Sequence, residues 1–519
     1  MGKISRSIIS VFDKTNIIDL ANCLKEFKVE ILSTGGTAKL LKENGINVTQ
    51  VSDYTNFPEI MDGRVKTLHP KIHGGLLGRR DIPLHLSQME NHSILPIDMV
   101  IINLYPFETV TSQDNCSLEV AIENIDIGGP TLIRSGAKNY KHVTVVTDIS
   151  DYPMIIEELR KNNGVISEET NFYLANKAFG LTARYDGIIS NYLGCINSKK
   201  ETKTFPDTYT FQAKKVQDLR YGENPHQKAA FYKEYNLEAP SVAFASKIQG
   251  KELSYNNILD LASALELIKE FKEIVAVIIK HTNPCGVATS DKSLTDAYIK
   301  ARDCDPVSAF GGIIGFNRKV DEETAKEITN TFIEAIIAPE YSEGALAILN
   351  KKKDLRVLSV NLEGKIKKTE YDMKKVVGGL LIQEQDLGKV DVLNLQVVTK
   401  RVPTQEELKA MDFTWRVVKH VKSNAIVYGS FDRVFGIGAG QMSRVDSSII
   451  AGMKAEHIKD AVMASDAMLP FKDSVDEAAK LGITAIIQPG GSLRDKEVVK
   501  AADSFNIAMI FTGMRHFRH

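Results

Sequence analysis

The sequence predicts an α/β protein with more than one domain. Short apolar runs alternate with helical patterns over the first 150 residues, and a second mixture of strand and helix patterns fills the carboxy-terminal part. Between them lies NSKKETKTF (197–205), a polar, lysine-rich stretch that is typical of a linker. The 519 residues also exceed what one hydrophobic core usually supports. We therefore expect domains of residues 1–200 and 201–519.

In the first domain the runs form a βαβ series. Strands are expected at SIISVF (7–12), VEILSTGG (29–36), MVIINLYPF (99–107) and HVTVVTD (142–148), and helices at residues 13–27, 37–45 and 151–197. Because strands alternate with helices, we expect a parallel sheet with helices on both faces.

The second domain shows mixed α/β patterning and a weak internal echo. Its strand candidates are AVIIKH (276–281), GGIIGF (311–316), NAIVYG (424–429), RVFGIGAG (433–440), ITAIIQPGG (483–491) and AMIFTG (508–513). A charged stretch at 351–375 divides it into subdomains of about 201–360 and 361–519. IIKHTNPCG resembles HVKSNAIVYG, and SAFGGIIG resembles RVFGIGAG. The echo indicates two related halves.

Composition argues against several classes of protein. A net charge of −1 gives no global basic field to recruit nucleic acid, and no apolar run approaches the length of a membrane span. The first residues lack the apolar core of a secretory signal. Five cysteines stand far apart without a CxxC pair, which argues against a disulfide framework or a structural zinc site. We expect a reduced, cytoplasmic protein without membrane or nucleic-acid partners.

Several motifs of the first domain suit a phosphorylated ligand. LSTGGTAKLL places residues 33–37 between a strand and a helix, where N–H groups and hydroxyls can bind an anion. A tight turn with an N-cap is the alternative. In GRVKT, Arg64 and Lys66 can face one anion if the segment is extended. His69 and His73 have metal-like spacing, but a helix start lies between them and no carboxylate is near, so structural histidines are favoured.

Two further motifs complete this group. NLYPF supplies Asn103 and Tyr105, and IDIGGPTLIRSGAKN supplies Asp126 and Lys138. In IDIGG a carboxylate stands beside two glycines, which allow a ligand to approach the backbone closely. A lone Asp or Lys is most often a surface residue, but here both accompany GRVKT in one small domain.

In the second domain VIIKHTNPCGVA ends an apolar run in a cluster of titratable groups. Zinc deaminases carry H-x-E and P-C-x-x-C, but here the second thiolate and the glutamate are missing. Cys285 lacks a recognisable partner, and buried cysteines are usually inert. His281 as a base beside Lys280 remains, with a structural strand-end histidine as the alternative. GIGAGQMSR departs from the dinucleotide fingerprint because Gln441 replaces its third glycine.

The motifs taken together resemble the bifunctional purine-synthesis family. STGGTAK, GRVKTLHP, NLYPF, IDIGG, RYGENPHQ, KHTNPCG, IIAP, VKSNAI, GIGAGQMSR, PFKD and QPGGS occur in the family's order over almost the whole chain. The resemblance implies a methylglyoxal synthase-like amino-terminal domain with IMP cyclohydrolase activity. It implies two cytidine deaminase-like subdomains that transfer a formyl group from 10-formyltetrahydrofolate to the carboxamide ribotide AICAR. The product, FAICAR, is then closed to IMP, without a metal, in a homodimer.

The resemblance also implies roles for individual residues. For formyl transfer, His281 would be the base, with Lys280 and Asn424 beside it. The ribotide and folate would be held by Arg220, Tyr221, Asn257, Phe310, Gly311, Glu334, Arg444, Val445, Met468, Pro470, Ser492, Leu493, Arg515 and His519. For ring closure, the implied catalytic residues are Lys66, Tyr105, Asp126 and Lys138, with Lys138 as the leading proton shuttle. The phosphate and ribose would be held by Ser10, Lys14, Ser33, Thr34, Gly35, Gly36, Thr37, Arg64, Thr67, Asn103 and Gly128.

Two departures from the family pattern stand at ligand positions. Many relatives have Ser where Phe12 stands, so one hydroxyl is lost at the phosphate, and Met468 replaces a Phe common in animal members. Two rival hypotheses follow from the sequence. In one, only one half is active and the other senses a phosphosugar; in the other, the chain is a zinc deaminase.

Overall fold

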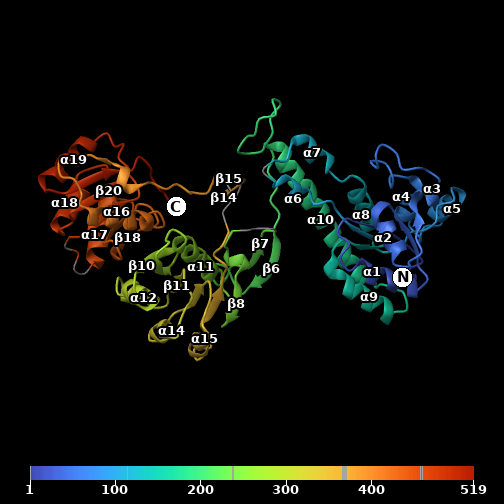
Figure 1. Ribbon diagram of the computed structural model, residues 1–519, viewed down its shortest axis with the longest axis horizontal. Helices are drawn as coiled ribbons and strands as arrows, with labels where there is room; N and C mark the ends of the chain where they lie inside the picture. The colour runs from blue at the N-terminus through green and yellow to red at the C-terminus, as the bar shows by residue number, and fades with distance from the viewer. Residues whose placement is uncertain (1, 114, 236–238, 365–370, 456–457, 459) are drawn as a thin grey trace. The chain divides into compact units, whose positions relative to one another are not determined.

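The computed structural model describes residues 2–113, 115–235, 239–364, 371–455, 458 and 460–519. It divides into two compact units, Met1–Gln212 and Ala213–His519. Figure 1 shows the secondary structure of each unit. The units are described separately.

Unit 1 is built on a five-stranded parallel sheet with the order β3-β2-β1-β4-β5. Its strands are β1 (Arg6–Val11), β2 (Glu30–Ser33), β3 (Thr49–Gln50), β4 (Met99–Asn103) and β5 (Thr144–Val146). The central β1 and β4 read as nearly continuous apolar runs because both faces of the sheet are buried. Four of these strands confirm the predicted ones. The two-residue, polar β3 was not predicted, since it has no apolar run.

Helices cover both faces of this sheet, as predicted. One core contains α1 (Ile17–Glu26) and α9 (Tyr152–Lys161), and the other contains α4 (Pro70–Leu77), α8 (Gly128–Lys138) and α10 (Glu168–Gly194). The Ser167 hydroxyl accepts the Thr170 N–H and so caps the start of α10. The other helices are α2 (Gly35–Glu43), α3 (Val51–Thr55), α5 (Pro83–Asn91), α6 (Phe107–Thr111), α7 (Leu118–Glu123) and the 3-10 turn η1 (Ile149–Asp151).

Unit 2 contains two six-stranded mixed sheets that share one topology. The first has the order β10-β9-β11-β12-β13-β8 and the second β18-β17-β19-β20-β21-β16. In each, an antiparallel hairpin is followed by three strands that run parallel to one another and by an antiparallel edge strand. The first sheet comprises β8 (Ser246–Gln249), β9 (Ile274–Lys280), β10 (Asn283–Ser290), β11 (Ile313–Phe316), β12 (Ala335–Ala338) and β13 (Arg356–Ser359). The second comprises β16 (Gln396–Val397), β17 (Ile426–Gly429), β18 (Val434–Gly438), β19 (Val462–Ser465), β20 (Ala485–Gln488) and β21 (Ala508–Phe511).

The structure therefore contains an internal repeat, but not in the register of the sequence echo. Topologically, β9 corresponds to β17 and β11 to β19. In the echo, Lys280 ends β9, whereas Lys422 precedes β17; SAFGGIIG contains β11, whereas RVFGIGAG contains β18. The matched motifs thus occupy non-equivalent positions, because the repeat resides in the order of the strands and not in those short motifs.

A single core joins the two repeats. Helices α11 (Tyr255–Ile268) and α16 (Gln405–Val418) both lie in it, together with side chains from both sheets. Each helix begins with a reciprocal capping box, Ser254 with Asn257 and Thr404 with Glu407. Residues of α12 (Leu294–Arg302), α14 (Glu322–Thr329) and α15 (Glu343–Leu349) cover the outer face of the first sheet. Residues of α17 (Arg444–Lys454), α18 (Asp473–Lys480) and α19 (Asp495–Ser504) cover that of the second.

Two short ribbons complete unit 2. They are formed by β6 (Lys214–Leu219) with β7 (Ala229–Lys233) and by β14 (Tyr371–Val376) with β15 (Gly379–Glu384). The predicted charged connector contains β13 and β14, while its residues 365–370 lie outside the described part. The remaining elements are α13 (Pro306–Ala309) and the 3-10 turns η2 (Val242–Phe244) and η3 (Val392–Asn394).

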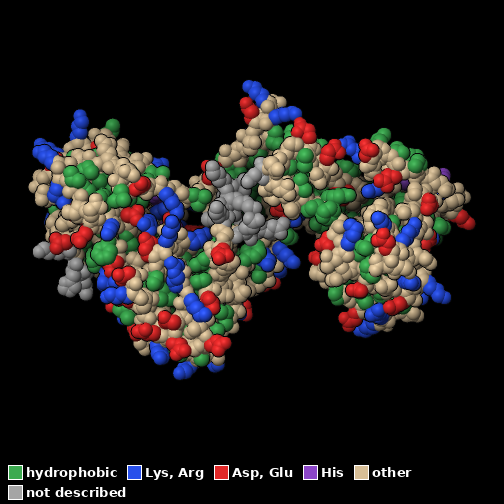
Figure 2. All heavy atoms as spheres, in the orientation of Figure 1, with side chains coloured by type: hydrophobic (Ala, Val, Ile, Leu, Met, Phe, Trp, Pro, Cys, Tyr) green, Lys and Arg blue, Asp and Glu red, His purple; other side chains and the backbone are tan. Residues whose placement is uncertain are grey.

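Charges of both signs are mixed over the surface. Basic and acidic side chains alternate over the visible face of each unit (Figure 2), in keeping with the net charge of −1. In the described ranges, we find no helix with the length and apolar character needed to cross a bilayer.

Candidate active sites

The turn between β9 and β10 carries the predicted base. His281 and Thr282 have φ angles of 54° and 61°, the left-handed values that both central residues of a tight two-residue hairpin turn adopt. Asp260 of α11 accepts the N–H groups of His281 at 3.2 Å and Thr282 at 2.6 Å. The carboxylate thus fixes the turn from outside the hairpin. No sequence motif indicated Asp260, which precedes the turn by 21 residues.

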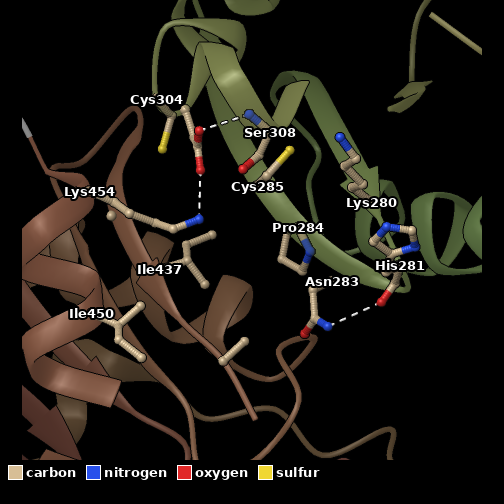
Figure 3. Close-up of a pocket in the computed structure, with 13 residues that line it drawn as sticks. Lys280, His281, Asn283, Pro284, Cys285, Cys304, Ser308, Ile437, Ile450 and Lys454 are labelled. Atoms are coloured by element: carbon tan, nitrogen blue, oxygen red, sulfur yellow. Dashed lines mark hydrogen bonds and ion pairs between the residues drawn. The ribbon is translucent and has the colours of Figure 1, made fainter. Parts of the chain in front are cut away.

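Lys280 and His281 project from this hairpin at the edge of a cavity of about 230 Å³. Figure 3 shows both side chains at the same end of the hairpin. The Lys280 ammonium donates to the carbonyl oxygen of Phe310 at 2.8 Å, which ties it to the loop before β11. Asn283 and Pro284 from the start of β10 line the same cavity. A cation and an imidazole therefore line one cavity.

The thiol beside them is poorly suited to nucleophilic attack. Burial, with a further contribution from Asp305, raises the pKa of Cys285 to about 12, so the sulfur stays protonated near neutral pH. Cys304 lines the same cavity, and burial also raises its pKa. Among the described residues, no group of three or more His, Cys, Asp or Glu side chains is placed to hold a metal ion. These observations favour the Lys–His pair among the three alternatives.

The second repeat contributes the segment 422–424 to this site. The Lys422 N–H donates to the Asn283 side-chain oxygen at 2.9 Å, so this segment is bonded to the first hairpin. The Lys422 ammonium donates to the His519 carbonyl oxygen at 2.7 Å. Burial, and then Arg518 and Lys374, lower the pKa of Lys422. Sequence reasoning missed Lys422, although it stands in the quoted VKSNAI motif.

Asn424 and Arg444 have places that differ from those expected. The Asn424 amide nitrogen donates to the carbonyl oxygens of Gln441 at 2.9 Å and Met442 at 3.2 Å, and its oxygen accepts from Arg444 at 2.7 Å. Both N–H groups are thus in use. The Arg444 guanidinium is buried and paired with Asp466, which is fully buried. In this conformation Arg444 orients Asn424 and does not face an open anion site.

Several other residues predicted to hold ligands lie at one end of the two six-stranded sheets of unit 2. Lys280 ends β9, while Phe310, Gly311 and Glu334 precede the neighbouring β11 and β12. In the second sheet, Asn424 precedes β17, and the segments at Met468, Ser492 and Arg515 follow β19, β20 and β21. Val445 and Pro470 are half-buried, and Phe310, Met468 and Leu493 are exposed. The His519 ring packs against that of Phe517 in a tilted arrangement, with the centroids 5.6 Å apart.

Two of these residues also have structural partners. Asn257 is buried in the capping box of α11, and Glu334 pairs with Arg356 at 2.7 Å. Arg220 lies over the Tyr221 ring at 5.7 Å. The neighbouring Glu223 carbonyl accepts from Asn256 at 3.5 Å, so this segment adjoins the start of α11.

In unit 1 the predicted residues gather at the carboxyl ends of parallel strands. Lys14 follows β1, Ser33 ends β2 and residues 34–37 follow it, and Asn103 ends β4 with Tyr105 two positions later. The strand order reverses between β1 and β4, and open α/β sheets bind ligands outside such a reversal. The sheet alone therefore predicts a ligand site at this edge.

The segment at residues 33–37 has the strand–turn–helix form that the sequence predicts. Gly35 has φ of 47°, and α2 begins there. The Ser33 hydroxyl donates to Ile9 O at 2.7 Å and the Thr37 hydroxyl to Val11 O at 3.0 Å. Those two hydroxyls therefore brace the loop. A side chain at Gly36 would meet Lys14 at 3.9 Å, and the Ser10 and Thr34 hydroxyls lie 3.4 Å apart.

Asp126 stands at the start of α8 in a half-buried position. Burial raises its pKa, while a hydrogen bond from the Gly129 N–H at 2.8 Å and the charge of Lys66 oppose the rise. A Cβ on Gly129 would lie 2.6 Å from the Asp126 carboxylate, and one on Gly128 would lie 2.9 Å from the Thr67 hydroxyl. Both glycines are needed for this close packing, and IDIGG was the signal for it.

Three residues of unit 1 that were predicted to act on the ligand either have a protein partner or lie at the far end of a helix. Asn103 braces the β1 loop by accepting from Phe12 N at 2.6 Å and Asp13 N at 3.0 Å. Arg64 pairs with Glu123. Lys138 is the last residue of α8, roughly 15 Å along the helix axis from its start at Gly128. The structure does not bring Lys138 to Asp126 within one chain, because adjacent motifs in sequence occupy opposite helix ends.

The chain is similar to known proteins over its whole length. Residues 16–131 match the MGS-like domain, and residues 136–454 match the AICARFT/IMPCHase bienzyme. The chain is 54% identical over 532 residues to the bifunctional purine biosynthesis protein PurH of Magnetococcus marinus, covering 100% of both chains. A solved structure titled "Crystal structure of ForH" is 32% identical over 36% of this chain and 94% of that chain. Its TM-score of 0.33 carries no structural argument.

Proposed function

Because the chain belongs to the AICARFT/IMPCHase bienzyme family and is a bifunctional enzyme of de novo purine synthesis, we propose that each unit carries one of its two activities. Unit 2 would be the AICAR formyltransferase and unit 1 the IMP cyclohydrolase. The observation that supports this division is the presence of two separate polar clusters, each at one end of its own sheets. Formyl transfer needs a donor, and 10-formyltetrahydrofolate is the donor in this proposal.

In unit 2 His281 is the proposed general base for the 5-amino group of the ribotide. That amine is conjugated with its ring and carboxamide and is a poor nucleophile. Removal of its proton as the new C–N bond forms contributes typically about 10² to 10⁴ in rate. The proton returns to the departing folate nitrogen. Lys280, held at Phe310 O, would stabilise the charge that develops on the formyl oxygen. The proposed transfer uses no metal ion.

Asn424 has a narrower role here than the resemblance implies. Both amide N–H groups donate to main-chain oxygens, so the amide oxygen is the atom left to meet a substrate. It would accept from the carboxamide NH₂ of the ribotide. Arg444, which donates to the same oxygen, would act as a positioning residue.

Three exposed apolar side chains at the strand ends of unit 2 are suited to a planar folate ring. Phe310 is 58% exposed and Met468 43% exposed, and both lie in segments at the ends of strands. With Leu493 they would cover the pteridine. Arg220, Tyr221, Gly311 and Arg515 would hold the ribotide. These assignments keep the donor next to the Lys–His pair.

In unit 1 the proposed chemistry is ring closure of the formylated ribotide. The carboxamide nitrogen attacks a formyl carbon in the same molecule, so the main task is to fold the substrate into a reactive geometry and move protons. Burial raises the pKa of Asp126, and perturbed carboxyl groups of this kind are typical of sites that move protons. Lys66 and Tyr105 stand beside it, and Lys14 with residues 33–37 would hold the phosphate.

Two variants of the full-length chain test this division. His281→Ala should lower kcat for formyl transfer by about 10² to 10⁴ while ring closure of supplied FAICAR stays unchanged. Asp126→Asn should lower kcat for ring closure of FAICAR while formyl transfer stays unchanged. Lys280→Met should also lower formyl transfer, and its matched control is Lys272→Met, at an exposed lysine just before β9, which should leave transfer unchanged. Normal transfer by His281→Ala would show the base assignment to be wrong, and loss of both activities in one variant would refute the division.

The proposal also includes a cytoplasmic homodimer acting on AICAR, FAICAR and IMP. Light scattering of the purified chain tests the dimer, since a single species at the mass of one 57.5 kDa chain would contradict it.

A further inference from the structure

An exposed aromatic pair stands at the strand reversal of unit 1. Phe12 follows β1 and Tyr105 follows β4, and their ring centroids lie 5.3 Å apart with the planes tilted by 55°. Phe12 is 49% exposed and Tyr105 44% exposed. Two large rings thus lie half in solvent at the sheet edge where ligands of open α/β sheets bind. Phe12 has no part in the chemistry proposed above.

The backbone that carries Phe12 is firmly held. The Asn103 side-chain oxygen accepts the N–H groups of Phe12 and Asp13, and its nitrogen donates to Asp13 O at 2.9 Å. Asn103 is also the last residue of β4, two positions before Tyr105. The segments that carry the two rings are therefore joined by three hydrogen bonds. The pair has a fixed frame, which lowers the entropic cost of binding on it.

The neighbours of the pair indicate what would lie on it. On one side, Lys14 donates to Phe12 O at 3.3 Å and approaches Gly36, which belongs to the segment 33–37 proposed to hold the phosphate. On the other side, the Tyr105 backbone contacts Asp126. A ribotide has its phosphate at one end and its heterocycle at the other. With the phosphate at residues 33–37 and the reacting groups at Asp126, the heterocycle reaches the space beside the two rings.

We propose that Phe12, together with Tyr105, stacks on the heterocycle of the ribotide and of IMP and thereby selects a planar base in unit 1. This inference rests on the cyclohydrolase function proposed for that unit. Aromatic side chains stack on bases through their π faces, and their removal typically weakens binding by roughly fivefold to 150-fold.

Inhibition of ring closure tests the proposal in the full-length enzyme, because it reports only the site that closes the ring. Inhibition constants would be measured for IMP and for ribose 5-phosphate, which has the phosphate and sugar but no base. The variants are Phe12→Leu, which keeps an apolar side chain, and Phe12→Ala. Phe172→Leu is the matched control, because Phe172 is 53% exposed and pairs with Tyr140 at the same 5.3 Å centroid distance on another surface of unit 1.

The expected result is a rise of the IMP inhibition constant by about fivefold in Phe12→Leu and more in Phe12→Ala. The constant for ribose 5-phosphate should change less than about twofold, and Phe172→Leu should match the wild type. Equal IMP constants in all variants would overturn the inference, and so would an equal rise for ribose 5-phosphate, which would place the defect at the phosphate. If the wild type closes no ring, the proposed function fails and takes this inference with it.

Discussion

Removal of Asp260 is expected to disable formyl transfer without touching the groups that perform it. Asp260 accepts the two N–H groups of the turn that carries His281, at 3.2 and 2.6 Å. Hydrogen bonds to a charged group contribute about 1.5–3 kcal/mol each. Burial raises the pKa of Asp260 and offsets part of this gain, so we take the lower value, about 3 kcal/mol for the two bonds.

The turn needs this support because two non-glycine residues hold left-handed backbone angles there. Each such residue costs roughly 1–2 kcal/mol, a sum close to what Asp260 provides. In Asp260→Ala the turn should relax and displace His281. A displacement of about 1 Å can lower catalysis about 10²-fold. We therefore expect kcat for formyl transfer to fall about 10²-fold, and urea unfolding to show a loss of about 3 kcal/mol.

The control is Asp321→Ala, which removes another carboxylate that accepts a main-chain N–H in the same repeat. Asp321 caps α14 by accepting from Thr324 N at 2.8 Å, and its loss should cost about 1 kcal/mol with transfer unchanged. Asp260→Asn should fall between wild type and Asp260→Ala, since an amide oxygen can accept one bond but its NH₂ would face the other donor. Transfer by Asp260→Ala within twofold of the wild type would refute this reasoning.

Two further predictions concern buried charges of unit 2. Arg444→Met should lower the free energy of unfolding by about 3–5 kcal/mol, because it leaves the Asp466 carboxylate buried and unpaired; adding Asp466→Asn should restore part of that loss in urea titrations. Burial opposes ionisation of Glu270, but His420 and Lys419 together lower its pKa to about 2, so Glu270→Gln should cost about 3 kcal/mol near neutral pH. That stabilisation is complete at pH values above the ordinary pKa of 4.5 and is lost as pH falls toward 2. The difference in unfolding free energy between wild type and Glu270→Gln should therefore shrink from pH 6 to pH 3. A difference that stayed constant over this range would speak against the ion pair.

Local patterns were sufficient for much of the fold. The strands around Ile8, Val100 and Ile278 are buried on both faces, and such strands show as apolar runs. The strands that were not predicted include the edge strand β3, the hairpin partner β10 and the short buried strands β12 and β19. β10 begins with Asn283 and Pro284, a start that looks like a loop until its pairing with β9 is known. Pairing is a long-range property, and short windows of sequence do not contain it.

The site was predictable where a residue acts through its own motif. Lys280, His281 and residues 33–37 lie at strand ends, as their patterns indicate. The residues that position them were not predictable. Asp260 acts across 21 positions and Asp466 reaches Arg444 across 22. Lys138 shows the converse, because it is near Asp126 in sequence but at the far end of α8. Distance along the chain does not indicate distance in space when a helix intervenes.

The core shared by α11 and α16 has a consequence for how the sequences of the two repeats of unit 2 can change. Each repeat uses the other as its solvent-excluding wall, so an enlarged side chain at Leu261 must be accommodated by residues such as Met411 in the same apolar cluster. The two repeats are therefore constrained to change together. A substitution in the core of one repeat should be compensated by a substitution in the other. Substitutions in the second repeat should therefore affect the position of the hairpin that bears His281 in the first.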